Sequence, residues 1–159
     1  MALTLLTDSY DSIANIDTYW AARGGTDWAA LTDANKEIYI RKATDWIDRN
    51  FNFIGYAATS AQRLAWPREQ AIDRDDYLLA NTDAPWQVKE ACAIVADLYR
   101  AGTYDLEGVI TDDAGIIKTV VDVIEIEYDS RARRRGADSI THVNLLLGPL
   151  STGNELLRS

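Results

Sequence analysis

The sequence predicts a mainly α fold: a small helical bundle of three main helices plus a short helix, followed by a short C-terminal β strand or hairpin and an extended C-terminal docking arm. Apolar residues recur at helical spacing in three stretches, each bounded by a capping residue or a glycine. β-Branched residues dominate one later stretch, residues 116–128. A length of 159 residues with 47% hydrophobic content allows one domain with its own core.

Two helices are predicted before residue 50. The first spans about residues 11–23 and stops at Gly24 and Gly25. Thr32 is a suitable N-cap for the second helix, which runs to about residue 49. The aromatic stripe of this second helix is interpreted as core rather than as a ligand site. The stripe consists of Tyr39, Ala43, Trp46 and Ile47, and the positions expected to face solvent are Lys36, Arg41, Asp45 and Asp48.

A third helix is predicted from Asp83, as the cap, to Gly102, with Pro85 in its first turn. A long connection, residues 50–82, separates it from the second helix and contains a possible short helix at 60–65. The acidic stretch at residues 73–76 lacks the glycine and the spaced glutamate of a calcium loop. We therefore interpret it as a solvated loop.

Residues 116–128 are predicted to form strand. Apolar residues change parity between Val123 and Ile124, which predicts a bulge or a bend between two short strands. Such a strand region has an edge with which another copy of the chain can pair. The carboxylates that then share one face are Glu125, Glu127 and Asp129.

The charge changes sign near the C-terminus, which predicts a boundary between residues 1–130 and residues 131–159. Residues 1–130 have a net charge of −12, whereas residues 131–159 have a net charge of +3 and are rich in leucine. Such a segment is typical of a docking arm, with leucines folded back on the parent core as the alternative. The expected docking residues are Arg131, Arg133, Arg134, Arg135, Ile140, Val143, Leu145, Leu146 and Leu147.

No catalytic constellation is recognisable. His142 is the only histidine, and Cys92, the only cysteine, lies among small and apolar neighbours. No phosphate-binding glycine loop occurs. The apolar run at residues 3–6 is too short for a signal peptide or a membrane span. We expect a protein of the cytoplasm or of an assembly made there, with no enzymatic activity, no metal, no cofactor and no membrane partner.

One sequence element carries a resemblance to a known family. The residues Gln62, Leu64, Trp66, Pro67 and Arg68 follow a helix that contains tyrosine and tryptophan, a second helix that ends in Ile-Asp, and a glycine. In this order the chain, from about residue 10 to residue 150, resembles the head-tail adaptor, or head-completion, proteins of tailed bacteriophages. Related sequences are also labelled DnaT-like single-strand-DNA-binding proteins, after a bacterial primosomal factor.

The resemblance implies a structural protein of the virion neck, assembled in the host cytoplasm. It implies a ring of about twelve copies that binds the portal protein and links the DNA-filled head to a stopper or tail-completion protein. The C-terminal docking residues would insert at the portal or at a neighbouring copy. Packaged DNA would pass through the ring without specific binding, along acidic candidates such as Glu125, Glu127 and Asp129.

A single-strand-DNA-binding protein is the alternative. Its stacking platforms would be Trp28, Trp66, Trp86 or Tyr104, placed beside the arginine cluster. The net charge of −9 counts against it, because phosphate neutralisation supplies most of such affinity. An unrelated helical interaction module is the third possibility.

Overall fold

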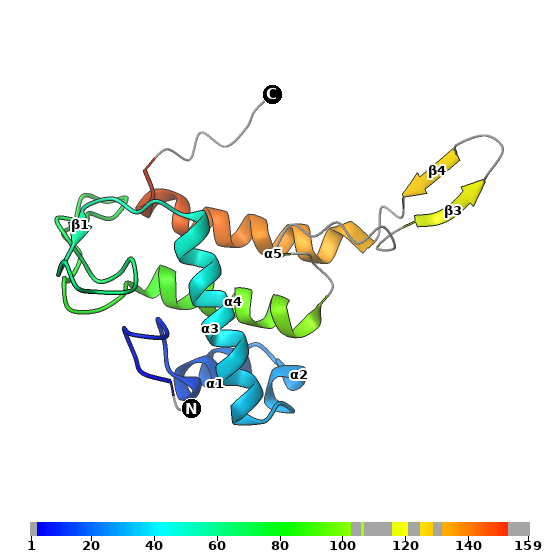
Figure 1. Cartoon of the computed structure of the whole chain (residues 1–159), viewed down its shortest axis with the longest axis horizontal. Coiled ribbons are helices and arrows are strands. Elements are labelled where there is room, and N and C mark those ends of the chain that lie inside the picture. Colours follow the sequence, from blue (N-terminus) through cyan, green and yellow to red (C-terminus); the bar gives the residue numbers. More distant parts are fainter. Residues whose placement is uncertain (1–2, 103–105, 107–115, 121–124, 129–131, 153–159) are drawn as a thin grey trace.

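The computed structural model describes residues 3–102, 106, 116–120, 125–128 and 132–152 of the chain. Its architecture is mainly helical, as predicted, with a few short strands (Figure 1). The helices are α1 (Ile13–Ala21), α2 (Thr26–Ala29), α3 (Asp33–Asn50), α4 (Trp86–Ala101), α5 (Ala132–Leu147) and the 3-10 turn η1 (Gly148–Leu150). The strands are β1 (Tyr56–Ala57), β2 (Arg68–Glu69), β3 (Ile116–Val120) and β4 (Glu125–Tyr128).

The three predicted main helices are confirmed as α1, α3 and α4, and their ends follow local chemistry. The side chain of Ser12 caps α1, and that of Thr32 caps α3 as predicted. Gly102 ends α4 in the left-handed conformation, with a φ of 60°. The predicted cap at Asp83 is wrong: Pro85 occupies that position, and the Asp83 carboxylate lies 2.6 Å from the Lys89 ammonium.

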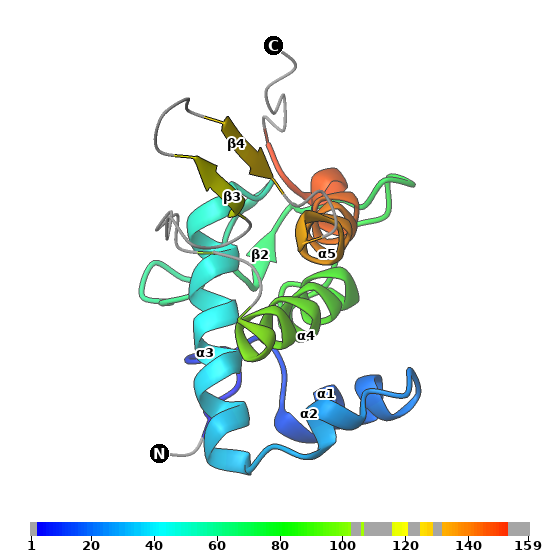
Figure 2. The same ribbon diagram turned by 90° about the vertical axis from the view of Figure 1, so that its right-hand side faces the viewer.

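The core lies where α3 crosses α4 and where α5 packs along α4 (Figure 2). α1 contacts α2, α3 and α4 at one end of this core. The long connection between α3 and α4 covers the other end. The side chains that are entirely or almost entirely buried include Tyr10, Ile16, Trp28, Ile40, Ile47, Trp66, Val88, Val95, Val143, Leu147 and Leu150.

The C-terminal segment is a helix that contributes to the core, and the prediction of an extended arm is wrong. Val143, Leu147 and Leu150 are fully buried, because their spacing turns them toward the same face of the segment. The backbone N–H of Ile54 donates to Leu150 O at 2.9 Å, and Phe53 forms an antiparallel bridge with Ser151. The segment that follows residue 130 therefore shares one core with the segment that precedes it.

Two further predictions are corrected. Lys36 was expected to face solvent, yet it is 5% exposed, because its ammonium lies 2.9 Å from Asp17 Oδ1 while its stem is covered. The possible helix at residues 60–65 does not form; the segment is a series of turns and bends. The Gln62 side chain binds the backbone there and so replaces helical hydrogen bonds.

β3 and β4 form an antiparallel hairpin, so the prediction of two short strands is confirmed. The register shifts between Ile116 and Lys118. The predicted break between Val123 and Ile124 lies outside the described residues. Figure 1 shows the hairpin well away from the helices, beyond the N-terminal end of α5. Neither strand pairs with any other strand in the part of the chain that the structure describes.

Candidate functional site

The motif runs from Gln62, in the connection after β1, to Arg68, the first residue of β2, and its polar side chains bind the backbone. The Gln62 amide donates from Nε2 to Leu64 O at 2.8 Å and to Pro67 O at 3.0 Å. Its Oε1 accepts from the Thr59 N–H at 3.0 Å. One side chain thus closes the turn that leads into β2.

Arg68 holds the same connection from its other side. The guanidinium donates to Ile54 O at 2.7 Å, to Gly55 O at 2.8 Å and to Ala65 O at 3.1 Å. Because a guanidinium presents its donors as a rigid fork, it can bind these carbonyls of two separate segments together. Arg68 therefore holds the segment that follows α3 against the motif.

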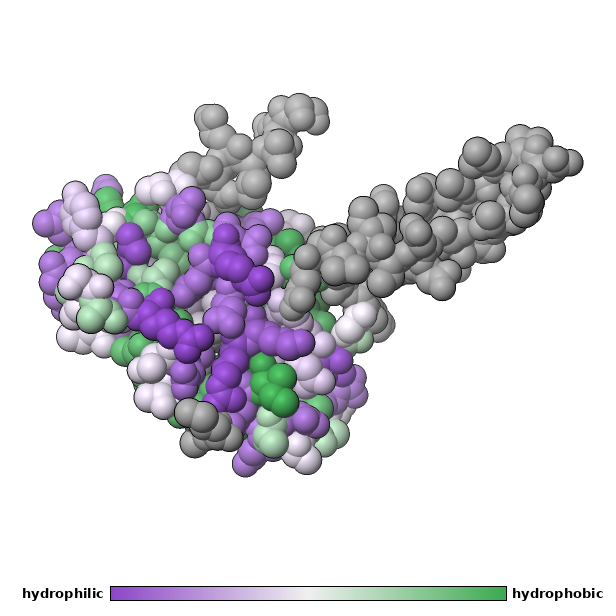
Figure 3. All heavy atoms as spheres, in the orientation of Figure 1, coloured by the Kyte–Doolittle hydropathy of each residue, from purple (hydrophilic) through white to green (hydrophobic). Residues whose placement is uncertain are grey.

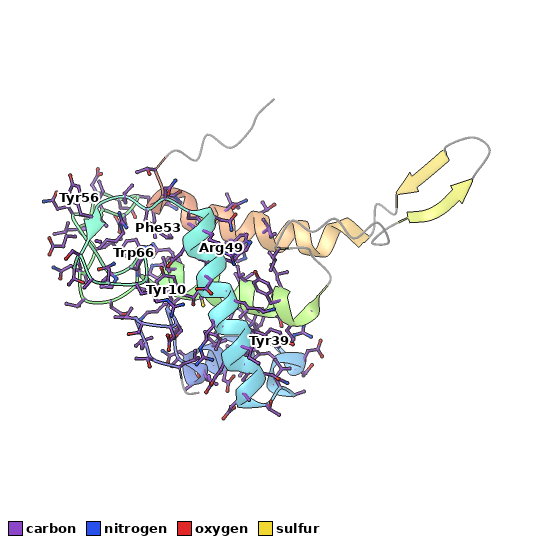
Figure 4. All side chains as sticks on the ribbon, in the orientation of Figure 1. Tyr10, Tyr39, Arg49, Phe53, Tyr56 and Trp66 are labelled. Carbon is purple, nitrogen blue, oxygen red and sulfur yellow. The ribbon has the colours of Figure 1, made fainter. Side chains whose placement is uncertain are left out.

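The apolar members of the motif belong to the core. Leu64 is 3% exposed, and Trp66 is fully buried, with its ring centroid 5.5 Å from that of Phe53. Figure 4 shows Trp66 and Phe53 between the long connection and α3, with Tyr56 at the outer edge. The peptide bond before Pro67 is cis. The motif thus shapes this end of the molecule, and its residues Arg63 and Leu64 also line a shallow pocket with Asp45, Asp48 and Arg49 of α3.

A carboxylate on α3 completes the attachment of the motif. Asp48 accepts from the Tyr10 hydroxyl through Oδ1 and from the Ala65 N–H, 3.1 Å away, through Oδ2. Burial raises the pKa of Asp48 above its ordinary value, although both hydrogen bonds favour the charged form. Burial, and then the nearby Asp48 charge, raise the pKa of Tyr10. Tyr10 and Asp48 therefore join the N-terminal segment, α3 and the motif.

The predicted docking leucines are divided between the core and the surface. Val143 and Leu147 are fully buried, so the alternative in which leucines fold back on the core applies to them. Ile140 and Leu146 are partly buried against the same core. Leu145 is 72% exposed and remains available to a partner.

The predicted arginine cluster lies at the unfavourable end of a helix. Arg133, Arg134 and Arg135 occupy the first turn of α5, while Arg131 lies outside the described residues. The helix dipole disfavours cations at an N-terminus, by about 0.3–1 kcal/mol each. These three positive charges therefore do not stabilise the N-terminal end of α5.

The acidic candidates for a channel surface fall on the hairpin. Glu125 and Glu127 belong to β4, two residues apart, which places them on one face of the strand. Asp129 lies outside the described residues. The described strands of the hairpin carry one lysine, Lys118, against these two glutamates.

The cations of residues 3–102 are engaged within the molecule. This stretch holds ten Lys and Arg against fifteen Asp and Glu, and seven of the ten lie within 3.8 Å of a carboxylate oxygen. Of the other three, Arg68 and Arg49 donate to backbone carbonyls, and the Lys42 ammonium lies 5.5 Å from the centre of the Tyr99 ring. Figure 3 shows hydrophilic residues gathered along the face followed by α3. Most cations of residues 3–102 thus have a carboxylate neighbour that competes with a phosphate backbone.

The aromatic residues considered as stacking platforms are mostly unavailable. Trp28 is 1% exposed, and its indole N–H donates to Asp17 at 2.8 Å. Trp66 is fully buried, and Tyr104 lies outside the described residues. Trp86, at the start of α4, is 63% exposed. Of the three candidates that the structure describes, Trp86 is thus accessible to a nucleic-acid base.

The other reactive side chains considered in the sequence are Cys92 and His142. Cys92 is a free, buried cysteine, and burial raises the pKa of its thiol to about 12, which keeps it protonated. His142 is exposed on α5. Among the described residues, no cluster of His, Cys, Asp or Glu has the geometry of a metal site. No described helix combines the length and apolarity needed to span a bilayer.

An exposed surface that was not predicted from the sequence lies in the connection between α3 and α4. We call it the loop-tip surface; it consists of Tyr56, Ile72, Asp75, Asp76, Tyr77 and Leu78. Ile72 and Leu78 pair as an antiparallel bridge, and Asp73 Oδ1 accepts from the N–H groups of Asp75 and Tyr77. Four of the eight large hydrophobic side chains exposed in the described structure lie here. The apolar residues beside the acidic turn were the available signal.

Comparison with known proteins gives one family. A family model described as "Putative DnaT-like ssDNA binding protein" matches residues 5–158, nearly the whole chain. No curated protein and no solved structure matches the chain.

Proposed function

The chain belongs to the family described as "Putative DnaT-like ssDNA binding protein", and we propose that it acts as a structural adaptor in the neck of a tailed bacteriophage virion. In this proposal copies of the chain form a ring, of about twelve subunits, on the portal protein. The ring links the filled head to a stopper or tail-completion protein, and packaged DNA passes through its lumen. The role is architectural, without catalysis or a cofactor.

The β3–β4 hairpin is the observation that carries this proposal. A two-stranded hairpin without a packing surface is marginally stable in water. Its described strands contain four β-branched apolar residues, together with two glutamates and one lysine. This composition suits a protein surface or a neighbouring strand better than a phosphate backbone. A subunit that projects such an element away from its helices is suited to contact its neighbours in an assembly.

The C-terminal residues that remain accessible support the same role. Leu145 is exposed on α5, and the three arginines of the first turn of α5 call for an anionic partner surface, on the portal or on a neighbouring copy. Ring formation from identical subunits needs two different complementary surfaces on each chain. The acidic residues 1–130 and the basic residues 131–159 meet that requirement.

Single-strand-DNA binding is the second candidate, favoured by the family description and by the arginine cluster. Against it stand the paired cations of residues 3–102 and the burial of Trp28 and Trp66. A single-strand binder of this size would need accessible rings along a basic groove. We therefore place this activity second.

Co-sedimentation with the portal assembly of the same phage tests the proposal. The full chain should bind in stoichiometric, ring-forming amounts, and Leu145→Asp should reduce binding while His142→Asp, a similarly exposed change on α5, should not. A parallel titration with single-stranded oligonucleotides should give a dissociation constant weaker than about 0.1 mM at physiological salt. Absence of portal binding together with salt-sensitive, micromolar oligonucleotide binding would reverse the order of the two candidates.

A further inference from the structure

We propose that the loop-tip surface of one copy receives the arginine-rich first turn of α5 from a second copy of this chain, in a head-to-tail contact. The inference rests on the proposed ring and assigns its two complementary surfaces. It identifies the partner as the same chain and the contact as acidic and apolar on one side, and basic on the other.

The loop-tip surface has the properties of a protein contact. Tyr77 and Leu78 are 71% and 72% exposed, and Tyr56 is 67% exposed. Isolated exposed apolar residues are ordinary, but Ile72 and Leu78 are paired and Tyr77 lies beside them in the sequence, so exposed apolar side chains are concentrated at this turn. Asp73 holds the turn by accepting from the backbone N–H groups of Asp75 and Tyr77, which leaves the surface with a defined shape.

Charge complementarity indicates which segment binds the loop-tip surface. Asp75 and Asp76 are exposed beside Tyr77, and the single cation of the turn, Arg74, lies 3.8 Å from Asp75. Arg133, Arg134 and Arg135 are consecutive cations at a helix N-terminus, where the dipole disfavours them. An arginine side chain binds carboxylates through its guanidinium and also stacks on aromatic rings, so aspartates beside a tyrosine suit it. No similar group of consecutive cations occurs elsewhere in the sequence.

Geometry prevents this contact from forming within one chain. The C-terminal end of α5 is fixed to the α3–α4 connection, where Ile54 N donates to Leu150 O and Phe53 pairs with Ser151. From that end the 16 residues of α5 extend for about 24 Å. Figure 1 shows the connection at one end of the molecule and the start of α5 at the other. The acidic and basic surfaces of one copy therefore face different neighbours.

Opposite charges at opposite ends define a heterologous contact, which closes into a ring or continues as a filament. The acidic side belongs to a fixed turn and the basic side to a helix that is anchored in the core. Each subunit then uses each surface once. Leu145 is not required for this contact and remains available for the portal.

A charge-swap experiment in solution, without the portal, tests this inference separately from the adaptor function. Sedimentation velocity over a concentration series at low salt should show self-association of the full chain that weakens as salt is added. D75K/D76N and R133E/R134E should each raise the dissociation constant at least about tenfold. An equimolar mixture of the two variants should associate again, because each modified surface then meets its complement.

The control is D27K/D45N, which makes the same charge change at exposed aspartates outside the loop-tip surface and should associate like the unmodified chain. Asn is used at positions 76 and 45, and it suits the positive φ of 64° at Asp76. The inference is overturned if the unmodified chain binds itself more weakly than about 1 mM, if either variant associates normally, or if the mixture fails to recover. A normal portal co-sedimentation alongside any of these results would leave the adaptor function intact.

Discussion

Arg68 binds three backbone carbonyls of two segments through one side chain, so its effect on stability should exceed that of an ordinary surface arginine. Replacement by lysine keeps the charge but loses the fork that reaches Ile54 O, Gly55 O and Ala65 O. We expect Arg68→Lys to lower the free energy of unfolding by about 2–4 kcal/mol, since hydrogen bonds from charged donors contribute about 1.5–3 kcal/mol each.

Urea denaturation of the full chain measures this effect. The matched control is Arg49→Lys, because Arg49 is exposed and donates to a single carbonyl, Asp45 O, at 3.2 Å. The control should change the free energy of unfolding by less than about 0.5 kcal/mol. Equal effects of the two substitutions would mean that Arg68 does not hold the connection.

The Tyr10–Asp48 pair makes a prediction about pH. The folded-state pKa of Asp48 is raised above its unfolded value, near 4. Its contribution to stability is therefore fully present below pH 4 and is lost as the pH rises through the folded-state pKa. Tyr10→Phe removes a hydrogen bond that favours the carboxylate, so the pKa of Asp48 should rise further.

We accordingly expect Tyr10→Phe to destabilise the protein by about 2 kcal/mol at pH 7 and by clearly less at pH 4. Chemical denaturation at the two pH values, with a carboxyl titration of Asp48 by NMR, measures both quantities. Tyr56→Phe removes an exposed hydroxyl and should have no effect at either pH. A loss for Tyr10→Phe that is independent of pH would show that the hydroxyl does not act through the Asp48 charge.

At the scale of single residues, the sequence predicted the burial of apolar side chains better than it predicted the partners of charged side chains. The burial of Cys92 and of the stripe around Ile47 follows from apolar spacing, which is a local property. Lys36 was misplaced because its partner, Asp17, is 19 residues away in another helix. Arg68 was recognised only as part of the family motif, because its three carbonyl partners lie up to 14 residues away in the sequence.

At the scale of elements, the approach of Gly55 to β2 gives a prediction with an internal control. Gly55 has a φ of +75°, and a Cβ built on it would lie 2.3 Å from Glu69 O. Gly24 has a φ of +70°, but its Cβ would meet nothing within 4 Å. We expect Gly24→Ala to cost about 1 kcal/mol, which is the conformational term alone. Gly55→Ala should cost at least about 3 kcal/mol, because the backbone contact adds to that term.

Thermal and urea unfolding of the two variants separate these terms. Similar losses of stability would indicate that the backbone around Gly55 adjusts without strain.

The helices were predictable because caps such as Thr32 and stops such as Gly102 lie next to the helix ends that they satisfy. The α3–α4 connection was not predictable, because its shape depends on side chains that bind carbonyls up to 14 residues away within the connection. It depends also on a contact with η1, which is about 95 residues away.

At the scale of the whole molecule, the change of charge at residue 130 indicated a separate arm, whereas apolar burial joins both segments in one core. Surface charge indicates which partners a surface can bind, whereas buried apolar side chains show which segments fold into one core. Val143, Leu147 and Leu150 lie far from their core partners in the sequence, so their spacing alone did not separate docking from fold-back. The candidate site divides in the same way, into anchored leucines and an accessible Leu145.

This division gives a prediction for the C-terminal helix. Leu147→Ala removes a fully buried side chain from the interface of α5 with α4 and should lower the free energy of unfolding by about 2–5 kcal/mol. Leu145→Ala alters a side chain that is 72% exposed and should change it by less than about 0.5 kcal/mol. Urea denaturation curves of both variants measure the difference.

The same pair determines how docking at the portal should be tested. A chain that ends at residue 130 lacks Val143, Leu147 and Leu150, so it should expose the α4 face and lose its cooperative unfolding transition. Loss of portal binding by that truncated chain would therefore reflect unfolding rather than a missing contact. Only a variant such as Leu145→Asp, tested after its unfolding curve matches that of the full chain, separates the surface of α5 from its core. If Leu145→Asp binds the portal as well as the unmodified chain does, portal contact must lie on another surface.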